Sequence, residues 1–104
     1  MPLTLDPYVI ETLMPDLVGH DKQPSAFVVF LYLWARARHR AAGAHGPAGK
    51  WTTASLQQMA VETGLSKSAV QQAIRTLKRR RLVHGYQASA TAVPAYLVHT
   101  PWRR

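Results

Sequence analysis

The chain has 104 residues and carries 13 Lys and Arg against 5 Asp and Glu, a formal charge of +8, with no cysteine. That length supplies one hydrophobic core and no second unit, and the missing cysteines exclude disulfides, thiolate metal sites and cysteine nucleophiles. The charge is unevenly distributed along the chain. Residues 1–24 have a net charge of −3, from four acidic side chains and one lysine, whereas residues 25–104 have a net charge of +11, from 12 basic side chains and one acidic. A polyanionic partner is therefore expected for residues 25–104.

Residues 1–24 form an acidic leader in which Pro7 marks the start of a short helix. The helix is predicted to end near residue 14 and to bury four apolar side chains: Val9, Ile10, Leu13 and Met14. Pro15 either ends this helix or changes its direction, and residues 19–24 form a connection. The leader begins polar and acidic, so it does not resemble a signal peptide.

An apolar helix is predicted from Ser25, its cap, to about Ala42. Residues 26–35 (AFVVFLYLWA) are apolar on nearly every side, but these ten residues are far short of the about 20 that a membrane span needs. A helix that covers one side of a small domain shows only an apolar stripe. The second face must therefore be covered either by leader residues 8–18 or by the same surface of another copy.

Residues 43–50 (GAHGPAGK) are predicted to form a loop that ends in Gly-Lys, as a phosphate-binding loop does. The spacing does not fit, because Ala44 stands where the P-loop needs its first glycine. Trp51 also stands where Ser or Thr would hold magnesium. Nucleotide hydrolysis is therefore not expected.

Two helices joined by a tight turn are predicted between residues 54 and 80. Residues 51–53 are read as a short strand, and Thr53 as the cap of the first helix, which turns Leu56, Met59 and Ala60 inward. Gly64 supplies the left-handed backbone of the turn, and Ser66 caps the second helix, Lys67 to about Arg80. The inward face of the second helix follows the spacing i, i+4, i+7: Val70, Ile74 and Leu77.

The opposite face of this second helix carries amides, hydroxyls and cations of the kinds that contact base edges and phosphates. The candidate DNA-binding residues are Ser66, Lys67, Ser68, Gln71, Gln72, Arg75, Lys78 and Arg79. Residues 78–81 are four consecutive cations that occupy most of a helical turn, so they cannot share one direction. We expect two to face phosphates, one to lie along the following strands, and one to be solvated or stacked on an aromatic ring. Cations at a helix C-terminus also offset the helix dipole.

The segment from residue 51 to 99 resembles the winged helix-turn-helix domains of prokaryotic transcription regulators and of plasmid replication initiators. The matching residues are Leu56, Met59, Ala60, Gly64, Leu65, Ser66, Val70, Ile74 and Leu77, followed by the basic exit at residues 78–83. The resemblance implies a mostly α fold with a small β-wing, residues 25–104, preceded by the leader. Many such regulators dimerise through helices outside the DNA-contacting motif. We therefore expect a homodimer through helix 26–35 and the N-terminal segment, with a monomer covered by its leader as the alternative.

Two strands are predicted to complete the wing, at residues 82–87 and 95–99, with Leu82, His84, Leu97 and Val98 on the inner face. The linker 88–94 carries no Lys or Arg, although wings that enter the minor groove usually bring a cation. The tail returns to the body through Trp102 or extends along DNA through Arg103 and Arg104.

The five histidines show no metal-ligand spacing and no thiol or acidic cluster beside them, and no positioned base has an evident partner. We therefore expect no enzyme activity, cofactor or metal, and a cytoplasmic, nucleoid-associated location. The predicted function is sequence-directed binding of double-stranded DNA by a transcription regulator. The alternatives are a replication-initiator or partition-type module and a winged helix that binds protein.

Overall fold

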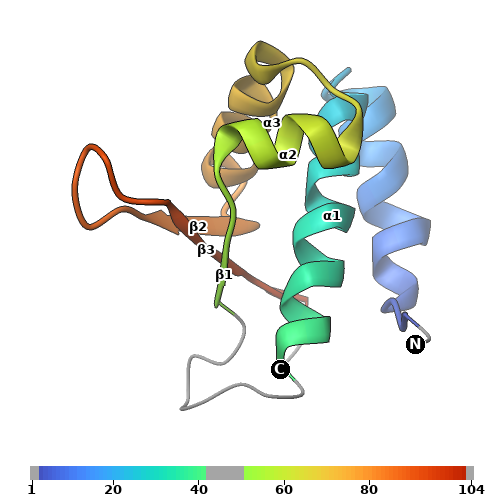
Figure 1. Cartoon of the computed structure of the whole chain (residues 1–104). Coiled ribbons are helices and arrows are strands. Elements are labelled where there is room, and N and C mark those ends of the chain that lie inside the picture. The colour runs from blue at the N-terminus through green and yellow to red at the C-terminus, as the bar shows by residue number, and fades with distance from the viewer. Residues whose placement is uncertain (1–2, 42–50, 103–104) are drawn as a thin grey trace.

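The chain is mostly helical with one small antiparallel sheet (Figure 1). The computed structural model describes residues 3–41 and 51–102. The elements are two π-helical turns, η1 (Val9–Leu13) and η2 (Asp16–His20), then α1 (Pro24–Ala41), β1 (Trp51–Thr53), α2 (Leu56–Thr63), α3 (Lys67–Arg79), β2 (Val83–Tyr86) and β3 (Ala95–Val98). The loop expected at 43–50 and the two terminal arginines lie outside the described residues.

The leader helix, residues 7–20, is longer than predicted. It does not end at Pro15, which keeps helical backbone angles, and it includes Gly19, assigned above to a connection. π-helical turns lie on both sides of this proline, which has no N–H to donate to the helix. The predicted buried face is wrong in part: Val9, Leu13 and Leu17 are buried, whereas Ile10 and Met14 are 41% and 37% exposed.

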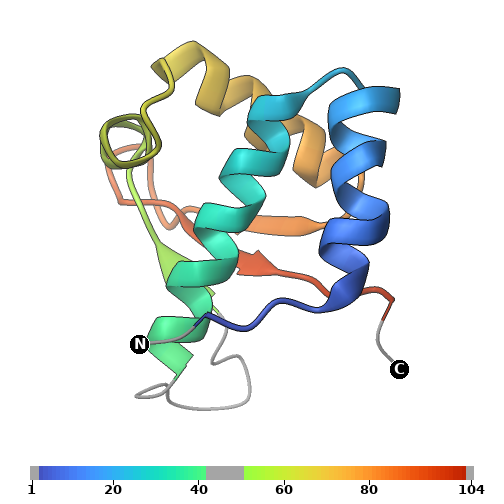
Figure 2. The ribbon, with the colours of Figure 1, turned by 90° about the vertical axis from the view of Figure 1, so that its right-hand side faces the viewer.

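Helix α1 is the centre of the fold, in contact with the leader on one side and with α3 and the sheet on the other (Figures 1 and 2). It begins one residue before the predicted cap, with Pro24 in the first position that proline favours. Its buried side chains include Phe27, Val29, Phe30, Leu33 and Trp34. The leader of the same chain thus covers one side of the apolar helix at 26–35, and α3 and the sheet cover the other, while Val28 stays 39% exposed. Within the described residues, no helix combines the length and hydropathy of a membrane span.

The three strands form a sheet in the order β1-β3-β2, with both pairs antiparallel. Leu97 of β3 pairs with Trp51 of β1 and His84 of β2. The predicted inner face is wrong at two positions, because His84 is exposed and Leu97 is only half-buried. Val83, Tyr96 and Val98 are the strand residues that join Leu82 in the core. The predicted strand at 51–53 is confirmed.

The C-terminal tail returns to the body through Trp102, one of the two alternatives that its sequence allowed. The Trp102 ring stacks on Tyr8, with ring centroids 4.8 Å apart, and also lies 6.2 Å from the ring of Trp34. Its indole Nε1 donates a hydrogen bond of 2.8 Å to Asp6 Oδ2. The tail therefore fastens the start of the leader helix to the core helix α1.

Candidate nucleic-acid interface

The turn between α2 and α3 is built by local hydrogen bonds around Gly64. Gly64 has a φ of 81°, as predicted, and its N–H donates to Ala60 O at 3.0 Å. Thr63 Oγ1 donates to Met59 O at 2.6 Å and accepts from Leu65 N–H at 3.3 Å. This role of Thr63 was missed above, although Ser and Thr hydroxyls commonly make such local backbone bonds.

Both helices of this pair are capped by a serine at the N-terminus. Ser66 Oγ accepts from Ala69 N–H at 3.1 Å, which confirms the predicted cap of α3. The cap predicted for α2 is wrong, because Ser55 Oγ, not Thr53, accepts from a backbone N–H, that of Gln58, at 3.0 Å. The helix consequently begins at Leu56, two residues after the predicted start. Thr53 and Ser55 are both short polar residues near the N-terminus of α2, so the sequence alone did not show which of them is the cap.

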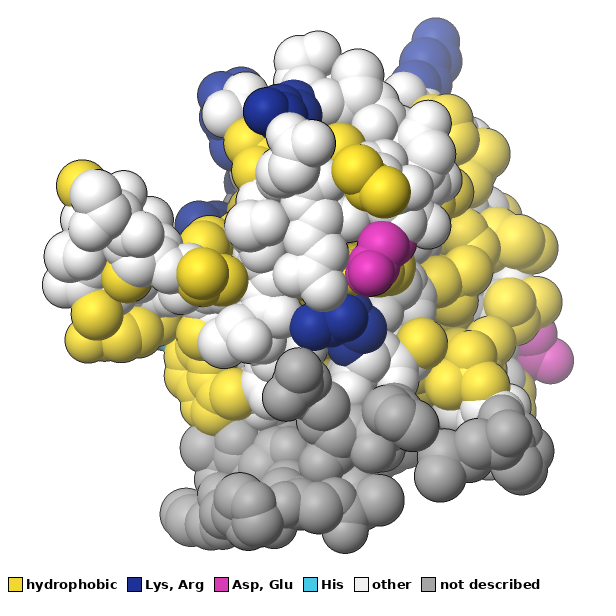
Figure 3. All heavy atoms as spheres, in the orientation of Figure 1, with side chains coloured by type: hydrophobic (Ala, Val, Ile, Leu, Met, Phe, Trp, Pro, Cys, Tyr) yellow, Lys and Arg dark blue, Asp and Glu magenta, His cyan; other side chains and the backbone are white. Residues whose placement is uncertain are grey.

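Helix α3 separates an apolar face from a polar one. Val70, Ala73, Ile74, Thr76 and Leu77 are buried, and all eight predicted DNA-binding residues are exposed. The side chains of Lys67, Gln71, Gln72, Arg75 and Arg79 form no hydrogen bond or ion pair with any described residue. Among the other predicted site residues, the hydroxyls of Ser66 and Ser68 lie 3.2 Å apart. In Figure 3, Lys and Arg side chains gather at the upper left, where α3 lies behind α2.

The four cations at residues 78–81 have different surroundings, as the helical turn requires. The stem of Lys78 lies against β2, since a Cβ placed on Gly85 would be 2.7 Å from Lys78 Cε. Arg79 is exposed, and Arg81 is exposed with a left-handed φ of 59°. Arg80 is half-buried and is paired with the leader, through Nη2 to Asp16 Oδ2 and through Nε to Asp21 Oδ2 at 3.3 Å. An ion pair was not among the roles expected for these cations.

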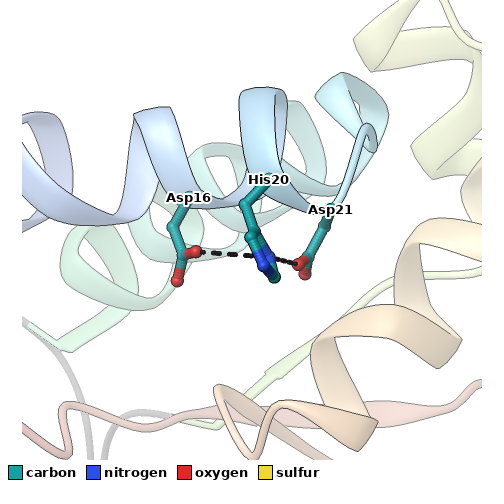
Figure 4. A group of neighbouring side chains, drawn as sticks. All are labelled: Asp16, His20 and Asp21. Carbon is teal, nitrogen blue, oxygen red and sulfur yellow. Dashed lines mark hydrogen bonds and ion pairs between the residues drawn. The ribbon is translucent and has the colours of Figure 1, made fainter.

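Asp16, His20 and Asp21 form a cluster on the leader (Figure 4). His20 Nδ1 lies 3.0 Å from Asp21 Oδ1 and 3.8 Å from Asp16 Oδ1. The expectation that no acidic cluster lies beside a histidine is therefore wrong for His20. Both carboxylates are already paired with the guanidinium of Arg80, which supplies the positive charge beside this cluster.

Another polar cluster joins α1, α2 and β1 away from the exposed face of α3. Arg36 donates from Nη2 to Thr53 O at 2.7 Å and lies 3.7 Å from Glu62 Oε1. Tyr32 OH donates a short hydrogen bond to the same carboxylate. Burial, together with this hydrogen bond, raises the pKa of Tyr32 to about 12. Arg36 and Glu62 thus serve the packing of α1 against its neighbours. Glu62 is the single acidic residue beyond position 24, and its carboxylate is bound to Tyr32 and Arg36.

The loop between β2 and β3 is exposed and uncharged. Gln87 Nε2 donates to Ala92 O at 2.7 Å and to Ala90 O at 3.3 Å, so this amide closes the loop across its base. Tyr86, the last residue of β2, and Val93, within the loop, are 61% and 56% exposed. The charge of this surface therefore comes from α3 and the turn after it.

Comparison of the chain with family models, with curated proteins and with solved structures gave no match.

Proposed function

We propose that the chain is a winged helix-turn-helix domain that binds double-stranded DNA in a sequence-directed manner, as a transcription regulator. The observation that carries this proposal is the polar face of α3, whose amides and cations are exposed and unpaired among the described residues. A helix with such a face fits the major groove, with its N-terminal half at the base edges. The basic balance of residues 25–104 supports a polyanionic partner.

Five exposed residues of α3 have a stated chemical role in this proposal. Gln71 and Gln72 pair with adenine N6 and N7, and Lys67 binds guanine O6 and N7 or a phosphate. Arg75 lies two turns beyond Lys67 and binds a phosphate or a guanine, and Arg79 binds a phosphate. The uncharged β2–β3 loop lies along the backbone of the duplex.

Selection of bound sequences from a random duplex library is the experiment that tests this function. We expect the selected sites to share a motif. Enrichment without a motif would reduce the function to unspecific binding, and no enrichment at all would contradict DNA binding and favour a protein partner. The location of the sites near promoters or near a replication origin distinguishes a regulator from an initiator.

Replacing Gln71 or Gln72 with Ala is expected to relax the sequence preference by about 1–3 kcal/mol, roughly 5- to 150-fold, because a bidentate base contact is lost. Arg79→Ala is expected to weaken binding to all duplexes alike, since phosphates carry no sequence information. Gln57→Ala, an exposed amide on α2, is the matched control and should keep the preference. Equal losses for all sequences in the three α3 variants would show that the base-contacting face is wrongly assigned.

We further propose that two copies associate through the outer face of the leader helix and α1. The supporting observation is a group of large apolar side chains that are 37–41% exposed: Tyr8, Ile10, Met14, Val18 and Val28. Figure 3 shows hydrophobic side chains gathered over this right-hand side of the molecule. An exposed apolar patch of this kind is typical of an interaction site. A two-fold dimer would place two α3 helices on half-sites about 34 Å apart.

The double variant Ile10→Lys with Met14→Lys is expected to be monomeric, because two cations would be buried opposite their copies. The control is Val61→Lys on α2, where Val61 is 70% exposed, and this variant should keep the dimer. Sedimentation checks both. A wild-type chain that sediments as a monomer well above micromolar concentration would remove the dimer and leave the DNA-binding proposal standing.

A further inference from the structure

Arg80 differs from the cations beside it because it forms ion pairs with two carboxylates of the leader. Its side chain is 31% exposed, and it contacts Asp16, which is 36% exposed, and Asp21, which is 15% exposed. Two nitrogens of one planar guanidinium each bind a different carboxylate, an arrangement that a lysine could not reproduce. The contact with Asp16 spans 64 residues of sequence.

This contact joins two parts of the fold with different roles. Arg80 is the C-cap of α3, and its N–H donates to Thr76 O at 2.9 Å. Asp16 opens η2 and Asp21 directly follows it, so both carboxylates are carried by the leader helix (Figure 4). The leader is packed on α1 along η2, whose Leu17 is fully buried. The last turn of α3 is therefore fastened to the core helix by way of the leader.

We propose that Arg80 is a positioning residue for α3 and not one of its phosphate contacts. This inference depends on the proposed DNA binding. Gln71 and Gln72 lie about 13 Å along the helix from Arg80, so a tilt of roughly 10° at the C-terminal end of α3 displaces these amides by about 2 Å. Such a displacement is a large part of a hydrogen-bond length and breaks bidentate base contacts. The carboxylates of the leader thus set the angle at which Gln71 and Gln72 meet the bases.

Three variants test this role: Arg79→Gln, Arg80→Gln, and Asp16→Asn with Asp21→Asn. Affinity is measured over a range of salt for a selected duplex and an unrelated one. Arg79→Gln should reduce the log–log salt slope by about 0.9 and weaken both duplexes alike. Arg80→Gln should leave the slope unchanged and lower the preference for the selected duplex roughly 5- to 150-fold, as for one lost base pair contact. The double Asn variant should lose the same preference although it keeps every cation.

An Arg80→Gln variant that matches Arg79→Gln in both slope and preference would overturn the inference, because Arg80 would then be a phosphate contact. Amide hydrogen exchange of residues 76–80 gives a second measurement that needs no DNA. Exchange there should be faster in Arg80→Gln and in the double Asn variant than in Arg79→Gln, and equal rates would also overturn the inference. Absence of duplex binding by the wild-type chain would instead remove the proposed function and leave the exchange test valid.

Discussion

Raising the salt concentration from about 50 to about 200 mM is expected to weaken binding of duplex DNA about 150-fold per chain. The estimate rests on four exposed cations of α3: Lys67, Arg75, Lys78 and Arg79. Each phosphate that a cation neutralises contributes about −0.9 to the log–log slope, so four give a slope of about −3.6. The leader has four of the five acidic side chains, and Glu62 is bound to Tyr32 and Arg36, which leaves the cations of α3 uncompensated.

Arg75→Gln should reduce this slope by about 0.9, since one released counterion is lost. Lys22→Gln is the matched control, because Lys22 is also an exposed cation but lies between the leader helix and α1. The control should leave the slope unchanged. A slope near zero for the wild-type chain, or an equal decrease in both variants, would contradict an electrostatic contact centred on α3.

The helix pair was predictable because its signals are local in sequence. Gly64 needs a left-handed backbone, Ser66 offers an oxygen to the next turn, and the apolar spacing through Leu77 fixes the buried face of α3. Each of these signals acts within a few residues and does not depend on the rest of the fold. The same reasoning correctly left the eight candidate residues of α3 on the exposed face.

The contacts that hold the leader and tail were not predictable in this way. Arg80 finds Asp16 across 64 residues, and Trp102 finds Asp6 across 96. Such pairs follow from how α1, the leader and the sheet are stacked, and one sequence without this arrangement gives no pattern for them. As a result, one of four consecutive cations has a role that its neighbours do not share.

For the strands and the leader helix, the prediction of which face is buried was wrong for a different reason. β2 and β3 each have only four residues, and apolar or aromatic side chains occur at both alternating positions of β3. Alternation is then too weak to distinguish the inner from the outer face, which is how Leu97 was placed inside. In the leader, two adjacent apolar stripes were available, and the fold buries the one with Leu13 while the one with Met14 stays exposed.

Trp34→Ala is expected to lower the free energy of unfolding by about 3–5 kcal/mol, a large part of the roughly 5–15 kcal/mol typical of a domain of this size. Trp34 is 1% exposed and lies against Phe30 and Trp102, with ring centroids 5.9 and 6.2 Å apart. Its Nε1 also donates to Thr4 O at 2.9 Å. Truncation would open a cavity where α1, the leader and the tail meet. Urea unfolding of the variant checks the expected loss.

Trp34→Phe separates the packing of this residue from its hydrogen bond. The smaller ring keeps most of the apolar contact but removes the donor to the carbonyl of Thr4, an exposed residue that water can reach, so the lost hydrogen bond costs about 0.5–1.5 kcal/mol. Val61→Ala, at a 70% exposed position on α2, should change the free energy of unfolding by at most about 0.5 kcal/mol. If Trp34→Ala were as stable as this control, the leader and tail could not be packed on α1, and the attachment of α3 through Arg80 would lose its foundation.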